Sequence, residues 1–353
     1  MRKVLAIIMS LMILGAMTVM TGCGGGSATD GGQVKILCFG DYFDPAVEAE
    51  FEAATGLDAV IDYFDTNEEM YPIVKNESVK YDVICASDYM IEKMAGEGLL
   101  AEISDENIPN TANLNEKYME AASAFDPGNK YAVPHTWGTL GILYNTDKIK
   151  KGEITSWNDL WKEEYKESIV MPDSMRDTLA IALKAKGYSL NTTDEKELAE
   201  ATDYLTEQKP LVYKYANDSA RDMLLGGSAD IAVVWNGEVL WCQEDMPQLD
   251  YVIPQEGSEE FVDCWAIPAA AENVEGAEKW IDFMLDEDVA MTNFEYLTFS
   301  IPNNAVIDAV KDDAKKMDVL FPADEVLEKC ESLKNLGAET DDMYTKYWTK
   351  FKA

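Results

Sequence analysis

Acidic side chains stand beside aromatic side chains at four places in this sequence, and the pairing suits one kind of chemistry. The four stretches are residues 39–42, 88–89, 235–238 and 261–263. An aromatic face attracts an ammonium group, and a carboxylate accepts charge-assisted hydrogen bonds from it. One such stretch is ordinary in a chain with 66 acidic residues. Because each stretch is expected at the end of a strand, the four together predict a cleft that binds an organic cation.

Enzymatic chemistry has little support in the sequence. It contains no GxGxxG or GxxxxGK[ST] phosphate-binding motif and no GxSxG nucleophile elbow. The single histidine, His135, excludes a metal site built from several histidines and leaves one candidate imidazole base. His135 follows a proline, and a structural role is the more common one for such a residue. We therefore expect no catalytic residue, no cofactor and no metal.

Composition and charge narrow the class of protein further. The chain has 353 residues, 47% of them hydrophobic, which is enough for about two domains with sizeable cores. Its 66 acidic and 29 basic residues give a formal charge of −37. Non-specific nucleic-acid binding is excluded because phosphate backbones recruit patches of Lys and Arg. An acidic surface instead tolerates or attracts cations.

Segments typical of strands and helices alternate along the chain. Buried strands are predicted by short apolar runs at residues 34–39, 58–63, 81–86, 140–144, 168–171, 229–235 and 261–267. Helices are predicted after most of these strands, and this alternation favours a mainly parallel sheet covered by helices. In such sheets ligands bind beyond the carboxyl ends of the strands. We therefore expect two α/β lobes around a cleft, joined by extended crossings near residues 137–140 and 261–264.

The N-terminus has the pattern of a targeting segment. Arg2 and Lys3 precede an uncharged, mostly apolar stretch, so residues 1–22 are predicted to be a signal peptide. A membrane-spanning anchor is the alternative, but the stretch is slightly short and glycines rather than basic residues follow it. Residues 20–23 resemble a bacterial lipobox, which implies a lipidated Cys23. Residues 23–33 are then a lipidated cysteine and a flexible leash.

The remaining cysteines indicate neither a metal site nor a redox site. The chain has six cysteines and no CxxC motif. If Cys23 carries lipid, at least one of the other five is unpaired. We expect them to be small buried hydrophobic residues.

Beyond these local patterns, the chain resembles the spermidine/putrescine-binding proteins of bacterial ABC importers. The matching stretches are collinear: residues 38–43, 81–94, 126–145, 155–166, 187–194, 234–237 and 261–268. The resemblance implies the type II periplasmic-binding-protein fold, an α/β fold with the ligand between two lobes. Lobe one would take residues 34–138 and 262–307, and lobe two residues 139–261 and 308–353.

The resemblance also implies which residues contact the ligand. They are Phe39, Asp41, Tyr42, Ser87, Tyr89, Asp177, Trp235, Glu238, Phe261, Asp263 and Phe299. Ser174 stands where spermidine-preferring members have Asp, and Glu238 stands where putrescine-preferring members have Asp. This pair favours putrescine being bound at least as well as spermidine, unless Asp88 or Asp173 restores the charge. We expect Glu238 and Asp263 to hold one terminal ammonium, and Asp41 and Asp177 to meet the rest of the ligand.

The function implied is that of a monomeric, lipid-anchored, extracytoplasmic binding protein without enzyme activity. It would capture putrescine or spermidine and deliver it to the permease and ATPase subunits of an ABC importer. Three alternatives remain open. They are a binder of another small cation or polar metabolite on the same fold, an acidic surface hydrolase and an adhesion module.

Overall fold

A mixed β-sheet runs through the chain and positions the site. The structure, a computed structural model, describes residues 32–353. The predicted signal peptide and Cys23 lie outside the described residues. The ten strands of the described residues are β1 Gln33–Phe39, β2 Asp58–Phe64, β3 Val83–Ser87, β4 Ala132–Asn145, β5 Ile169–Met171, β6 Val212–Tyr215, β7 Ile231–Trp235, β8 Leu249–Val252, β9 Glu259–Ala266 and β10 Glu331–Ser332. Their order is β2-β1-β3-β9-β4-β7-β5-β6, with β10 beside β9 and β8 beside β4.

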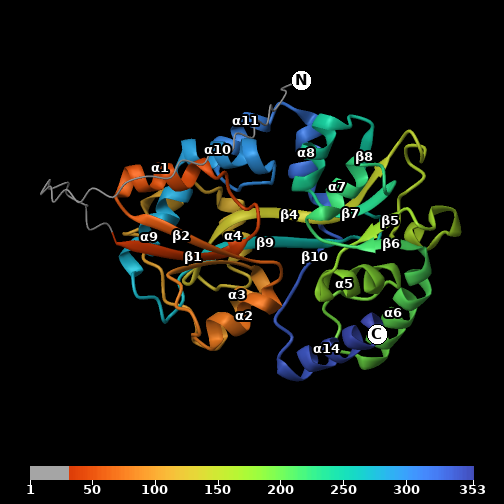
Figure 1. Cartoon of the computed structure of the whole chain (residues 1–353), viewed down its shortest axis with the longest axis horizontal. Helices are drawn as coiled ribbons and strands as arrows, with labels where there is room; N and C mark the ends of the chain where they lie inside the picture. The colour runs from red at the N-terminus through yellow and green to blue at the C-terminus, as the bar shows by residue number, and fades with distance from the viewer. Residues whose placement is uncertain (1–31) are drawn as a thin grey trace, which may run out of the picture. The chain divides into compact units, whose positions relative to one another are not determined.

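Helices cover both faces of this sheet (Figure 1). The α-helices are α1 Ala46–Thr55, α2 Asn67–Lys75, α3 Asp88–Gly96, α4 Glu116–Ala122, α5 Met175–Ala185, α6 Glu195–Gln208, α7 Ser219–Leu225, α8 Gly237–Asp245, α9 Val274–Met284, α10 Glu287–Leu297, α11 Asn304–Val310, α12 Ala314–Leu320, α13 Asp324–Leu327 and α14 Ala338–Lys352. Short 3₁₀ helices lie at Pro109–Asn113, Trp157–Trp161, Glu163–Tyr165 and Lys209–Leu211. None of the helices within residues 32–353 is both long enough and apolar enough to cross a membrane.

The first half of the sheet is formed by β1, β2 and β3, which are parallel. Side chains alternate between the two faces of a strand, so one strand feeds two cores. Ile36 packs with Phe51 of α1 and Trp280 of α9, whereas Leu37 packs with Met70 of α2 on the opposite face. Figure 1 shows α1 above these strands and α2 and α3 below them.

The second half is built in the same way around β5, β6 and β7, which are also parallel. Ile169 and Ile231 pack with helices α5, α6 and α14, while Val170 and Val234 pack with α7 and α8 on the other face. Because helices cover both faces of each half of the sheet, side chains on both faces of these strands are buried. This explains why the strands are continuous apolar runs in the sequence.

Strands β4 and β9 cross from one half to the other. They pair antiparallel with each other, and β9 also pairs antiparallel with β3. Along β4 the partner changes, from β9 as far as Thr139 to β7 and β8 from Leu140 onwards. The two halves are therefore joined by shared strands.

The structure confirms the predicted alternation of strands and helices and corrects one detail. Phe261 and Asp263, predicted at the end of a strand over residues 261–267, lie in the interior of β9, where Asp263 stands opposite both Ser87 and Thr136. The reason is that β9 is antiparallel to β3, so the carboxyl end of β3 meets the interior of β9. The cysteines fit the expectation of buried apolar residues: four of the five within residues 32–353 are buried, and all five are free thiols.

Gly138 on β4 offers a test of how closely the crossing strands pack. A Cβ atom here would overlap the side-chain oxygen of Asn236 and lie 2.9 Å from Cε1 of Phe261. Overpacking of this kind costs about 1–3 kcal/mol. We predict that Gly138→Ala lowers the free energy of unfolding in urea by that amount. Gly96→Ala, at a helix position with no atom within 4 Å of the added Cβ, should be neutral or slightly stabilising, and an equal loss in both variants would contradict the prediction.

Candidate functional site

The eleven residues named from the sequence as ligand contacts all line one cavity of about 460 Å³. They come from elements far apart in the sequence: the ends of β1, β3 and β7, the first turns of α3, α5 and α8, the interior of β9, and the segment after α10. Ser174 lines the cavity as well, whereas Asp88 and Asp173 are not among the lining residues. The structure therefore places the predicted residues together, while their contact with a ligand stays a prediction.

Asp263 is a deeply buried carboxylate of the cavity wall, with 5% of its surface exposed. The Tyr42 hydroxyl donates a hydrogen bond to its Oδ2 and lies 2.7 Å from Oγ1 of Thr136. Its Oδ1 is buried and has no partner among the described residues. Burial raises the pKa of Asp263 to about 6, although hydrogen bonds with Ser87 and Tyr42 favour the ionised form.

Two more buried acids stand near Asp263, and we call Asp177, Glu259 and Asp263 the inner carboxylate cluster. Burial, and then the charge of Asp177, raise the pKa of Glu259 well above its ordinary value. Beside Asp177, burial therefore favours the neutral form of Glu259. The three carboxyl groups lie close enough together that the charge of one disfavours the charge of the next.

Aromatic rings form the apolar part of the cavity wall. The ring of Tyr42 lies 5.1 Å from that of Phe39 and 6.1 Å from that of Phe299, measured between centroids. Phe299 packs directly on the backbone of Gly237, where no larger residue would fit. Trp235 and Phe261 complete this wall. Flat aromatic faces beside carboxylates are the surroundings that an alkyl ammonium group prefers.

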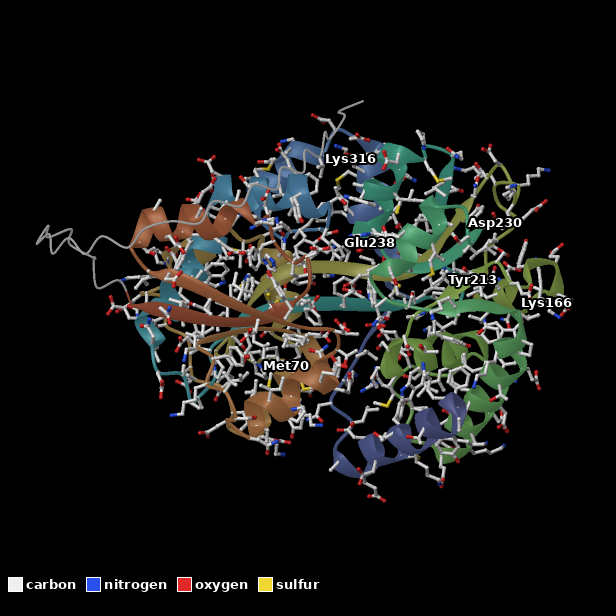
Figure 2. The ribbon with its side chains drawn as sticks, in the orientation of Figure 1. Met70, Lys166, Tyr213, Asp230, Glu238 and Lys316 are labelled. Carbon is white, nitrogen blue, oxygen red and sulfur yellow. The ribbon has the colours of Figure 1, made fainter. Side chains whose placement is uncertain are left out.

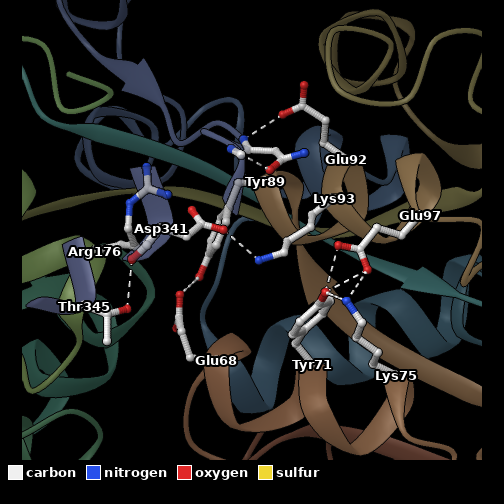
Figure 3. A network of polar contacts seen from close by, with 12 residues as sticks. Glu68, Tyr71, Lys75, Tyr89, Glu92, Lys93, Glu97, Arg176, Asp341 and Thr345 are labelled. Carbon is white, nitrogen blue, oxygen red and sulfur yellow. Dashed lines mark hydrogen bonds and ion pairs between the residues drawn. The ribbon is translucent and has the colours of Figure 1, made fainter. Parts of the chain in front are cut away.

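Tyr89 belongs to a polar network that spans the two halves of the sheet (Figure 3). Its hydroxyl donates to Glu68 with an O–O distance of 3.0 Å, and the guanidinium of Arg176 lies 5.3 Å from its ring centroid. Nearby, Lys93 on α3 forms an ion pair of 2.7 Å with Asp341 on α14. These contacts tie α3 of the first half to α5 and α14 of the second.

Arg221, on α7, is the one basic side chain among the described residues that line the cavity. Its guanidinium lies 3.2 Å from Oε2 of Glu238 and 3.3 Å from Oδ2 of Asp41, and 4.6 Å from the ring centroid of Trp241. Glu238, in the first turn of α8, is labelled near the centre of the view in Figure 2. Burial raises the pKa of Glu238 to about 7, against the nearby Arg221, which lowers it. We call Arg221, Asp41 and Glu238 the arginine cluster.

This arrangement adds a contact that the sequence did not predict. The structure places Glu238 with Asp41 around a shared guanidinium, while the joint role of Glu238 and Asp263 in holding one ammonium group stays a prediction. Asp263 neighbours Asp177, whose charge contributes to its raised pKa. Sequence reasoning missed Arg221 because α7 was not predicted, and it missed Glu259 because a buried acid inside a strand has no local signature.

His135 is buried, and it lies outside the set of residues that line the cavity. Its Nε2 donates to the backbone carbonyl of Tyr42 at 3.0 Å, and burial lowers its pKa to about 4. The neutral ring therefore holds the loop that carries Tyr42. This position agrees with the structural role expected from the sequence.

Two α/β halves that share crossing strands and enclose a cavity of acids and aromatic rings define a solute-binding protein of the type II periplasmic kind. The chain belongs to the bacterial extracellular solute-binding protein family, whose pattern matches residues 46–323. Members of this family bind solutes outside the cell.

Several relatives of known function cover nearly the whole chain. The spermidine/putrescine-binding periplasmic protein of Salmonella typhimurium is 32% identical over 342 residues, which cover 97% of each chain. The putrescine-binding periplasmic protein SpuD of Pseudomonas aeruginosa is 28% identical over 92% of this chain and 93% of the relative. The solved structure of the spermidine/putrescine ABC transporter substrate-binding protein PotD from Streptococcus pneumoniae has a TM-score of 0.76 at 32% identity, covering 91% of this chain and 98% of that one.

The hydrogen bond from Tyr42 to Asp263 leads to a prediction about proton binding. Tyr42→Phe removes a donor that stabilises the ionised carboxylate, so the pKa of Asp263 should rise above its value of about 6. Carboxyl-carbon NMR titration of the ligand-free protein measures this shift. Tyr81→Phe removes a hydroxyl that donates to Asp62 instead, and it should leave Asp263 unchanged. A pKa of Asp263 that does not move in Tyr42→Phe would mean that the hydroxyl does not support the charge.

Proposed function

We propose that this protein binds putrescine or spermidine in the cavity and delivers it to an ABC importer. The observation that carries the proposal is Oδ1 of Asp263, a buried carboxylate oxygen in the cavity wall without a partner among the described residues. A buried charge of this kind is costly unless it is paired. An ammonium group of the ligand would supply the missing partner, while its methylenes lie against the aromatic rings.

The names of the relatives support the same class of ligand. The matched proteins from Salmonella and Pseudomonas are described as binding spermidine, putrescine or both. The eleven residues proposed as ligand contacts are Phe39, Asp41, Tyr42, Ser87, Tyr89, Asp177, Trp235, Glu238, Phe261, Asp263 and Phe299. The proposal involves binding alone, with no covalent step.

The proposal extends to how the protein is held and how it moves. The protein acts as a monomer outside the cytoplasm, anchored to the membrane through a lipidated Cys23. Its two lobes, residues 34–138 with 262–307 and residues 139–261 with 308–353, close on the ligand by bending where β4 exchanges partners. The permease and ATPase of the importer are the partners, and the ligand is released to them.

Replacing Asp263 tests the ammonium site directly. Asp263→Asn keeps the size of the side chain and removes its charge, so the bound ammonium group loses its buried partner. Breaking a buried ion pair costs about 3–5 kcal/mol, which is roughly a 10²–10³-fold weaker affinity. We predict this loss for both putrescine and spermidine in titration calorimetry.

The control is Asp203→Asn, which removes an equal charge from an exposed ion pair with Lys350 and should leave both affinities unchanged. The pH dependence gives a second measure. Protons compete with the ligand for the Asp263 carboxylate, so wild-type affinity should fall as the pH drops through about 6. The Asn variant should lack this part of the dependence. Affinities within threefold of wild type in Asp263→Asn would place the ammonium site elsewhere.

A separate experiment tests the lipid anchor. Cys23→Ala removes the residue that would be acylated, so the protein should stay unprocessed or leave the membrane fraction. Metabolic labelling with a radioactive fatty acid, followed by fractionation, measures both. Cys330→Ala is a matched control, because it removes a free thiol outside the N-terminal segment. Labelling that persists in the Cys23→Ala protein would rule out Cys23 as the acylated residue.

A further inference from the structure

The groups that would recognise a second ammonium region of a polyamine are already occupied by the protein itself. Arg221 contacts both Asp41 and Glu238, and its guanidinium lies over the ring of Trp241. Two carboxylates and one aromatic face are the elements of an ammonium site. A guanidinium fork pairs with two carboxylates at once, which a single ammonium group cannot do as well.

The carboxylates that Arg221 does not contact are the ones available to pair with the ammonium groups of a ligand. The inner carboxylate cluster gathers three acids, Asp177, Glu259 and Asp263, on one part of the cavity wall, and mutual repulsion and burial work against all three being charged at once. Putrescine has two ammonium groups and spermidine has three. The third group of spermidine needs a partner outside this cluster, and Glu238, a buried acid of the cavity wall, is held by Arg221.

Resting on the proposed function, we infer that Arg221 is a specificity-determining residue, a built-in cation that takes Asp41 and Glu238 away from the ligand. The cavity then favours a diamine over a triamine. The selectivity depends on the arginine cluster as well as on Glu238, the acid that suggested putrescine from the sequence.

An anionic group on the ligand is a different partner for Arg221, and the cavity disfavours it. Ten carboxylic side chains line the cavity with this one guanidinium: Asp41, Asp65, Glu68, Asp177, Asp218, Glu238, Glu244, Glu259, Asp263 and Glu295. An anion entering beside Arg221 would meet this excess of negative charge. The two terminal nitrogens of the guanidinium, which would attract the anion, already contact the carboxylates of Asp41 and Glu238.

The test is calorimetry of putrescine and spermidine binding to the wild type and to Arg221→Gln. In the wild type the Kd for spermidine should exceed that for putrescine. In Arg221→Gln the two carboxylates are free to pair with the third ammonium group, so the ratio of these Kd values should fall at least tenfold. Lys346→Gln is the matched control, because it removes one positive charge from an exposed ion pair with Glu195 and should keep the wild-type ratio.

A second variant covers the case in which Arg221→Gln does not fold, since it leaves Glu238 buried and unpaired. The double variant Arg221→Gln with Glu238→Gln removes both buried charges and still frees Asp41, so the ratio should fall at least threefold. A ratio within twofold of wild type in the folded variants, or weaker spermidine binding in them, overturns the inference alone. If neither polyamine binds the wild type, the proposed function fails, and the inference fails with it.

Discussion

The site depends on a carboxylate buried in the middle of a strand. Asp263 lies inside β9, and three other elements meet at its side chain: Ser87 at the end of β3, Thr136 on β4 and the loop that carries Tyr42. An aspartate at such a depth is tolerated because hydrogen-bond donors surround one of its oxygens. The pairing of β9 with β3 and β4 therefore also fixes the position of the Asp263 carboxylate.

The cavity holds more negative groups than the protein alone can stabilise in the charged form. Burial raises the pKa of Asp263, Glu238 and Glu259, which means that the protein alone stabilises their charges less well than water does. A cationic ligand lowers each of these pKa values by pairing with the ionised form. Part of the binding free energy therefore comes from stabilising carboxylates that folding has buried without a full set of partners. At the arginine cluster, Arg221 already stabilises Asp41 and Glu238 in this way.

Much of this could be predicted from the sequence, and the failures have physical reasons. Short apolar runs marked the strands, and the residues that follow β1 and β3 were correctly expected to meet, because carboxyl ends of parallel strands share an edge. The end of β7 reaches the same cavity from the second half, although β7 runs antiparallel to β1 and β3. A strand over residues 261–267 was predicted, but its pairing with β3 and β4 on either side of Asp263 was not, since the antiparallel direction of a returning strand has no signature in local periodicity. Arg221 was missed because charge pairing between α7, α8 and the end of β1 depends on three-dimensional packing.

The return of β9 to the first half of the sheet has a consequence for how the chain is made. Ile84 on β3 pairs with Ala266 on β9, so the first half lacks a central strand until most of the chain exists. Contacts between such distant residues form late, because the loop between them must close first. The strands β4 to β8 of the second half all precede β9, so that half can pair its strands earlier. The residues nearest the N-terminus therefore wait longest for a partner, and the half of the fold that is made first is the half that is completed last.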